Sequence, residues 1–175
     1  MHTDEQHAIE SLEAIPRGLR SFKLPGHHYG MIGIKTSDGV YFIADALGSK
    51  ELISSEHILL IYDVAGYIQS LEYISKLDGI LVPSHSFVTT DISDLLRLNR
   101  NKMEEIMSLI FSILQNEQTV EEVVAEIFNY YNLRMSYNRY LLITATIRSY
   151  IAFLNNQGKV QKRFLNNKLY FSVAK

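Results

Sequence analysis

Two turn signals, Pro25-Gly26 and Asp38-Gly39, divide the early part of the chain into short apolar segments, and this spacing constrains the fold most strongly. Residues 19–24 alternate apolar and polar side chains, which predicts a β-strand that ends at the Pro-Gly loop. Residues 31–35 and 40–44 are predicted to pair as a hairpin, because Asp-Gly supplies the positive φ angles that a tight hairpin turn needs. A small sheet is therefore expected near the start of the chain.

Helical periodicity surrounds these strands and predicts a mixed α/β fold. Residues 5–15 have the spacing of a short helix, and residues 50–77 have that of a mostly helical segment with Gly66 as an interruption. Residues 80–82 are predicted to form a short buried strand. A long helix is predicted from residue 91 or 93 to about residue 114, because its apolar side chains recur on one face.

The charged residues are divided unevenly along the chain, although the formal net charge is only −2. Residues 1–118 contain 9 basic and 16 acidic side chains, whereas residues 119–175 contain 8 basic and 3 acidic ones. The near-neutral total argues against a protein that depends on nucleic acid or on a membrane surface. The uneven division predicts two modules, residues 1–118 and residues 119–175.

The second module has the order helix, helix and basic hairpin, which is the order of a winged helix. A capping box formed by Thr119 and Glu122 starts its first helix. The predicted elements are a helix to about residue 131, a helix over 137–155, and strands over 159–165 and 168–173. Basic side chains that could contact nucleic-acid phosphates are Arg134, Arg139, Arg148, Lys159, Lys162, Arg163 and Lys168. The alternative, which we favour, is a packing appendage with solvated charges, because its tyrosines suit a small core equally well.

The absence of cysteine limits the chemistry that the chain can carry. It excludes disulfides, a cysteine nucleophile and thiolate metal ligands, so any metal must be held by His, Asp or Glu. No uninterrupted apolar run approaches the length that a membrane-spanning helix needs, and the N-terminal residues are polar and acidic. A soluble cytoplasmic protein is therefore expected.

Three residues that can bind a metal follow predicted strands: His27, Asp45 and His85. Loops at one edge of a sheet converge in space, so residues far apart in the sequence can meet at a single site. Imidazole nitrogen and carboxylate oxygen are ligands that suit zinc, iron or manganese where no thiolate is available. On spacing alone, the three are either a shared metal site or separate surface and hydrogen-bonding residues.

Three segments around these residues resemble motifs of the metallo-β-lactamase superfamily. They are, in order, Leu24-Pro25-Gly26-His27-His28-Tyr29-Gly30, then Gly39-Val40-Tyr41-Phe42-Ile43-Ala44-Asp45-Ala46-Leu47, then Leu81-Val82-Pro83-Ser84-His85-Ser86. The resemblance implies the second half of the superfamily's αββα sandwich, followed by the winged-helix-like tail. It also implies that His27 binds a first metal, that Asp45 bridges two metals, and that His85 binds the second.

The sequence departs from the superfamily pattern in three places. Ala44 replaces the usual glycine before the aspartate, and His28 replaces a threonine and is expected to be a surface or substrate-side polar residue. The His-x-His-x-Asp-His signature, which supplies the other four ligands, occurs nowhere in the sequence. We therefore expect a fragment or truncated member of the superfamily that binds metal weakly or not at all and is inactive by itself.

The resemblance implies metal-dependent hydrolysis, in which hydroxide on a dinuclear zinc, iron or manganese centre attacks an ester, thioester, amide or phosphodiester. The alternatives are a di-iron redox member of the superfamily and a non-catalytic dimeric binding module with a basic, nucleic-acid-contacting tail. One half of the sandwich alone leaves an apolar sheet face in water, so a homodimer through that face is expected. The sequence does not identify the substrate.

Overall fold

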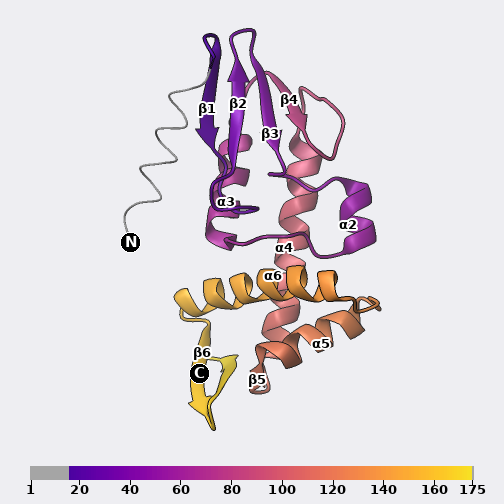
Figure 1. Ribbon diagram of the computed structural model, residues 1–175, viewed down its shortest axis with the longest axis vertical. Helices are drawn as coiled ribbons and strands as arrows, with labels where there is room; N and C mark the ends of the chain where they lie inside the picture. The colour runs from indigo at the N-terminus through magenta and orange to yellow at the C-terminus, as the bar shows by residue number, and fades with distance from the viewer. Residues whose placement is uncertain (1–15, 175) are drawn as a thin grey trace.

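The computed structural model describes residues 16–174, and the predicted helix over residues 5–15 lies outside them (Figure 1). The expected mixed α/β class is confirmed. In chain order the elements are β1 (Leu19–Lys23), β2 (Ile32–Thr36), β3 (Val40–Ala44), α2 (Lys50–Glu56), α3 (Val64–Ile74), β4 (Ile80–Pro83), α4 (Ser93–Ile113), β5 (Gln118–Thr119), α5 (Val120–Tyr130), α6 (Tyr137–Asn156), β6 (Val160–Leu165) and β7 (Lys168–Val173).

The first sheet has the strand order β1-β2-β3-β4, with antiparallel pairs at β1–β2 and β2–β3 and a parallel pair at β3–β4. The parallel pair brings the carboxyl ends of β3 and β4 to the same edge of the sheet. A backbone hydrogen bond from Ser84 N–H to the Ala44 carbonyl, 3.1 Å long, holds these two ends together. The residues that follow β3 and those that follow β4 therefore lie close together at this edge of the sheet.

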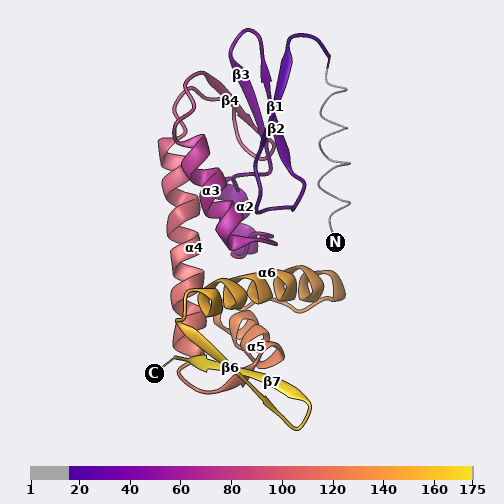
Figure 2. The ribbon, with the colours of Figure 1, turned by 90° about the vertical axis from the view of Figure 1, so that its left-hand side faces the viewer.

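The two faces of this sheet have different surroundings. Figure 2 shows α3 and α4 on one side of the sheet, where Tyr41, Ile43 and Leu81 are buried in the core. Side chains alternate along a strand, so Phe42 and its register partners Ile34 and Val82 face the other side. The Phe42 side chain is 46% exposed. The apolar outer face that the sequence leads us to expect is therefore present.

The segment predicted to be mostly helical over residues 50–77 contains two separate helices. α2 ends at His57, which has a φ of 59°, and the loop that follows buries Ile58 and Ile61. Asp63 then starts α3, because its side chain accepts a hydrogen bond from Gly66 N–H at 3.1 Å. Gly66 lies inside α3 and does not interrupt it; a Cβ there would lie 2.7 Å from the Asp63 carboxylate.

The second module contains the predicted order of helix, helix and hairpin. The capping box of Thr119 and Glu122 is present at the start of α5. The two-residue strand β5, which the sequence analysis does not predict, pairs with β7 in a sheet of order β5-β7-β6. A strand of two residues is too short to show a periodic pattern in the sequence, and it forms only because it pairs with the distant strand β7. α4 passes from the first sheet down to this module (Figure 1).

Hydrogen bonds tie α6 to the loop between α2 and α3. Thr146 Oγ1 accepts from Ile61 N–H at 3.0 Å, and Ser149 Oγ accepts from Val64 N–H at 3.1 Å. These bonds link residues 85 positions apart in the sequence, so the second module has a fixed position on the first.

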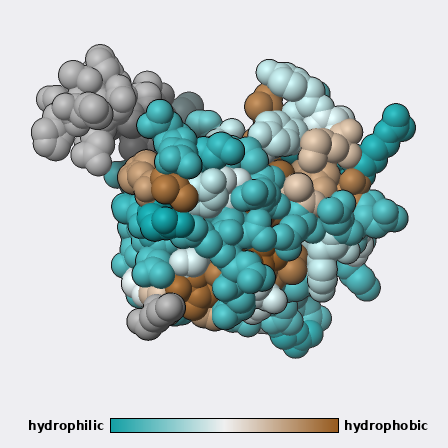
Figure 3. Space-filling view, turned by 90° about the horizontal axis from the view of Figure 1, so that it is seen from below, coloured by the Kyte–Doolittle hydropathy of each residue, from teal (hydrophilic) through white to brown (hydrophobic). Residues whose placement is uncertain are grey.

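The surface of the second module is mainly hydrophilic when the molecule is seen from below, and its apolar areas are broken up by polar side chains (Figure 3). Within residues 16–174, no helix combines the length and apolar character needed to cross a membrane.

Candidate metal site and adjoining pocket

A loop docked on the start of α3 holds His27. The Gly26 carbonyl accepts hydrogen bonds from Tyr62 N–H and Asp63 N–H at 2.8 and 3.0 Å. Gly26 has a φ of 126°, and a Cβ there would lie 2.4 Å from the Tyr67 backbone. Glycine is therefore required at this position both by its backbone conformation and by the close approach of α3. Because His27 follows Gly26 directly, this contact fixes where its side chain begins.

The His27 ring has a defined orientation and tautomer. Its Nδ1 lies 2.9 Å from the Leu60 carbonyl, which can only accept a hydrogen bond. Nδ1 must therefore carry a hydrogen, and in the neutral ring Nε2 then carries the lone pair. Nε2 lies 3.6 Å from Asp45 Oδ2. A hydrogen bond of this kind from one ring nitrogen to a carbonyl is the usual way that proteins orient a histidine that binds metal through the other nitrogen.

Asp45 lies between two anchored segments. The register of β3 and β4 shifts between Phe42 and Ala44, and Ala44 has a φ of 48°, a left-handed conformation that favours glycine. Beyond Asp45, the backbone N–H and C=O of Gly48 are both hydrogen-bonded to the Asn99 side chain at 2.9 Å. The turn at Ala44 and the bonds to Asn99 together direct the Asp45 carboxylate along the edge of the sheet.

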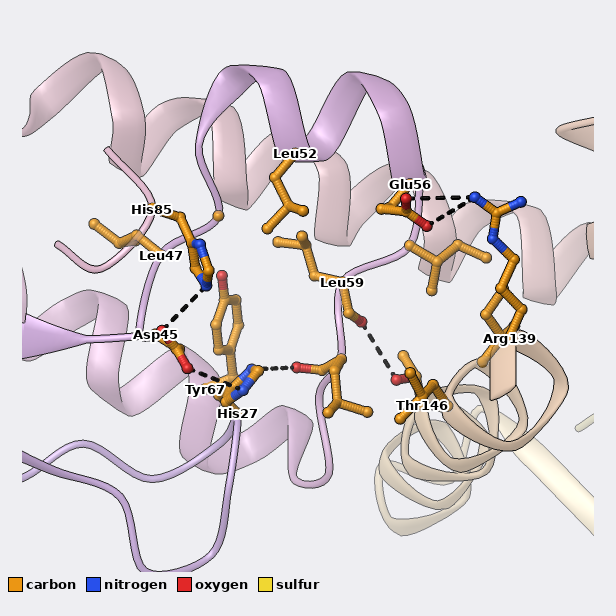
Figure 4. A pocket seen from close by; sticks show the side chains of 15 residues that line it. His27, Asp45, Leu47, Leu52, Glu56, Leu59, Tyr67, His85, Arg139 and Thr146 are labelled. Atoms are coloured by element: carbon orange, nitrogen blue, oxygen red, sulfur yellow. Dashed lines mark hydrogen bonds and ion pairs between the residues drawn. The ribbon is translucent and has the colours of Figure 1, made fainter. Parts of the chain in front are cut away.

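His85 approaches the same carboxylate from β4. Its Nε2 lies 3.3 Å from Asp45 Oδ1. The Nε2 atoms of two histidines thus face the two oxygens of one aspartate (Figure 4). The close approach predicted from the sequence is observed for both pairs that include Asp45. Within residues 16–174, no three His, Asp or Glu side chains are arranged as a group that could hold a metal ion. His27 and His85 each approach Asp45, but the three side chains do not form such a group by themselves.

The chemistry of this set fits a divalent cation. Two ligand atoms that are each about 2.1 Å from one ion, at an angle of roughly 110–120°, lie about 3.4–3.6 Å apart. The observed distances of 3.3 and 3.6 Å are close to this range. A lone pair on His27 Nε2 that faces a carboxylate is repelled by it unless a proton or a metal cation lies between them. Imidazole and carboxylate together suit zinc, iron or manganese.

A pocket of about 330 Å³ opens beside these residues. His27, Asp45 and His85 lie at one end of it, and the ion pair between Glu56 and Arg139 lies at the other (Figure 4). The walls between these ends are mostly aliphatic, with side chains from both modules: Leu47, Leu52, Ile58, Leu59, Leu60, Leu142 and Ile143. The candidate metal site is therefore one end of a larger apolar pocket.

Sequence reasoning missed Asn99 and Tyr67, two buried residues that support this pocket. Asn99 has the appearance of an ordinary polar residue on α4, and its partner Gly48 is 51 positions away. Tyr67 donates a hydrogen bond to Asn99 Oδ1 at 2.8 Å, and burial raises the pKa of Tyr67, so the hydroxyl keeps its proton. No local pattern around Asn99, Gly48 or Tyr67 indicates that the three residues meet in the folded protein.

Some of the basic side chains of the tail form ion pairs within the protein. Arg139 lines the pocket. Three of the candidate phosphate contacts form ion pairs with carboxylates, and the pairs are Arg139–Glu56, Arg148–Glu121 and Arg163–Glu117. Among the described residues, the other four candidates form no such pair: Arg134, Lys159, Lys162 and Lys168. Contact of the tail with nucleic acid stays a prediction.

Comparison with solved structures finds metallo-β-lactamase proteins. A metallo-β-lactamase family protein from Thermus thermophilus aligns with a TM-score of 0.67 and 17% identity, covering 88% of this chain and 49% of that protein. A beta-lactamase domain protein from Burkholderia ambifaria aligns with a TM-score of 0.71 and 12% identity, covering 89% and 48%. No model of a known protein family and no curated protein matches the sequence. The chain therefore has the fold of metallo-β-lactamase proteins and spans about half the length of these solved structures.

Proposed function

We propose that His27, Asp45 and His85 bind a divalent metal and that the site belongs to a metal-dependent hydrolase. The observation that carries the proposal is the convergence of two histidine Nε2 atoms on one carboxylate, at 3.6 and 3.3 Å. The hydrogen bond from His27 Nδ1 to Leu60 supports it, because this bond leaves the Nε2 lone pair directed at the site. The fold shared with metallo-β-lactamase proteins supports the same class of chemistry.

Each residue has a distinct part in this proposal. A divalent metal bound here would lower the pKa of a water molecule and so supply a nucleophile near neutral pH. His27 contributes a nitrogen in a fixed orientation, and Asp45 contributes one oxygen toward each histidine. His85 is the more exposed of the two histidines, so substrate reaches the site from its side. The apolar pocket holds the remainder of the substrate and keeps water away from it.

Within residues 16–174, His27, Asp45 and His85 are the donors that this proposal uses, and we propose that their affinity for metal is low. Three donors shared between two metals leave each with fewer protein ligands than the three or four that catalytic and structural zinc sites have. The complete activity is therefore proposed for a site that receives further ligands from residues other than these three. The parent reaction is hydrolysis of an ester, thioester, amide or phosphodiester.

The test is a titration of the metal-free protein with zinc, manganese and ferrous iron by isothermal calorimetry. The variants His27→Ala, Asp45→Asn and His85→Ala should each weaken binding at least about 10-fold, because each removes a donor. His28→Ala is the matched control, since His28 is adjacent to His27 and does not line the pocket. Binding that is unchanged in the three variants, or weakened equally by His28→Ala, would refute the proposal.

A further inference from the structure

We propose that the substrate of this site is an acyl compound, an ester or thioester, whose apolar acyl chain lies in the pocket between the two modules. Leu142 of α6 is then a specificity-determining residue that sets the length of the chain. This inference rests on the proposed hydrolase function and deepens it. It assigns a binding role to the second module, whose sequence indicates a packing appendage or a nucleic-acid contact.

The position of the pocket is the first support. It begins at the Asp45 carboxylate, so a molecule with its reacting carbonyl at His27 and His85 can place its next atoms inside it. Its volume of about 330 Å³ corresponds to roughly eleven water molecules. That is enough for an acyl chain of medium length, and it is too little for a folded macromolecule.

The polar side chains in the middle of the walls, those of Thr146 and Tyr67, already have hydrogen-bond partners in the protein. Thr146 Oγ1 accepts from Ile61 N–H and donates to the Leu59 carbonyl. The Tyr67 hydroxyl and both backbone groups of Gly48 are bonded to Asn99. A polar substituent in the middle of the pocket would therefore lose its water without finding a partner, which costs free energy. An alkyl chain loses nothing there and gains from burial.

The far end of the pocket is closed by an ion pair between the modules. Arg139 Nη2 lies 3.2 and 3.4 Å from the two carboxylate oxygens of Glu56, which joins α6 to α2. Because the two charges compensate each other, this end does not select an anionic group. The geometry fits a neutral chain end that stops against the ion pair.

The wall contributed by α6 is held in place, which a specificity-determining surface requires. The bonds of Thr146 and Ser149 to the backbone of Ile61 and Val64 fix α6 on the loop that also carries Leu60, the partner of His27. Leu142 follows Arg139 by three positions on α6, so the two side chains are neighbours on one face of the helix and Leu142 lies beside the ion pair that closes the pocket. A change at Leu142 therefore alters the length of chain that the pocket holds without releasing the helix.

The neighbouring residue Leu141 provides a matched control. Leu141 and Leu142 are 47% and 46% exposed, and both belong to α6. Only Leu142 lines the pocket. Truncation of either residue removes the same atoms from the same helix, so a difference between the two variants reports on the pocket alone.

The experiment is calorimetric titration of the protein in excess chelator with straight-chain N-methylamides of roughly four to ten carbons. These neutral probes mimic the acyl part and need no metal. Affinity should rise about 4-fold per added methylene, from about 0.8 kcal/mol each, and then stop rising once the chain reaches Leu142 and the ion pair at the far end of the pocket. Leu142→Ala should move that limit to longer chains by about three carbons, and Leu142→Phe should move it to shorter ones, whereas Leu141→Ala should match the unmodified protein.

Two results would overturn the inference. One is an affinity that does not depend on chain length, and the other is the same chain-length limit in the unmodified protein and in the three variants. Because chelator is present, these outcomes do not depend on whether metal binds at His27, Asp45 and His85. If the amides do not bind but metal does, the acyl-chain pocket is refuted and the proposed hydrolase site is not. Chain binding without any metal binding would leave the pocket standing and refute the hydrolase.

Discussion

Replacement of Asn99 by alanine should destabilise the fold more than any other single polar substitution on α4. The Asn99 side chain is buried and makes four hydrogen bonds, of which three reach other segments: Gly48 N–H, Gly48 C=O and the Tyr67 hydroxyl. The fourth goes to the Leu95 carbonyl in the same helix. The alanine variant leaves the three distant groups without a partner in the core.

The size of the effect follows from these three groups. An unpaired buried donor or acceptor costs about 1–3 kcal/mol, and such costs are not additive for groups in one network. Alanine is the better helix former by about 0.7 kcal/mol, which offsets part of the loss. We therefore expect the free energy of unfolding to fall by about 3 kcal/mol. For a protein of this length, that lowers the Tm by about 6–12 °C.

Urea unfolding followed by circular dichroism measures this change. Asn101→Ala is the matched control, because Asn101 is an exposed asparagine on the same helix and should change stability by less than about 0.5 kcal/mol. Tyr67→Phe removes one hydrogen bond and should cost about 1 kcal/mol, and its effect should be smaller when combined with Asn99→Ala. If Asn99→Ala costs no more than Asn101→Ala, the claim that Asn99 anchors the Asp45–Gly48 segment is wrong.

Three further predictions concern the strand end, the response to acid and the assembly. Ala44→Gly should raise stability by up to about 1 kcal/mol in the same urea assay, because Ala44 has a φ of 48°, and a loss of stability would contradict the strain. Burial alone raises the pKa of Glu105, but hydrogen bonds from Lys102 and Tyr131 outweigh it and lower the pKa. The ionised Glu105 carboxylate therefore stabilises the folded protein fully above about pH 4.5, and this contribution is lost as the pH falls through the lowered pKa. The free energy of unfolding of Glu105→Gln should therefore fall less than that of the unmodified protein between about pH 5 and pH 3. An equal fall in both proteins would contradict this. A homodimer with an interface of more than about 1,200 Å² is expected, and light scattering at micromolar concentration should detect it. Phe42→Asp should dissociate this dimer, whereas Phe164→Asp, at an exposed position on β6, should not. A monodisperse monomer of the unmodified protein would refute the prediction.

Local sequence signals predict much of the first sheet. Strand ends at Pro25-Gly26 and the turn at Asp38-Gly39 are encoded by residues that are adjacent in the chain, and the strands form where alternation indicates them. The placement of His27, Asp45 and His85 at one edge follows from the same signals combined with the resemblance to metallo-β-lactamase motifs.

Features that depend on distant contacts are not predictable in this way. The break between α2 and α3 arises because Ile58 and Ile61 are buried, which opposes the continuous helical pattern of residues 50–77. The role of Arg139 depends on Glu56, 83 positions earlier in the chain, and no local pattern pairs them. The wall of the pocket at Leu142 likewise exists only after α6 docks on the first module.

Long-range nitrogen-15 NMR of the histidine rings during a zinc titration tests the central claim most directly. Before zinc is added, the His27 ring should carry a hydrogen on Nδ1, as the bond to Leu60 requires. On addition of zinc, the Nε2 signals of His27 and His85 should shift together, while those of His28 and His57 stay in place. A hydrogen on His27 Nε2 in the neutral ring, or a first response at any other histidine, would contradict a shared metal site at Asp45.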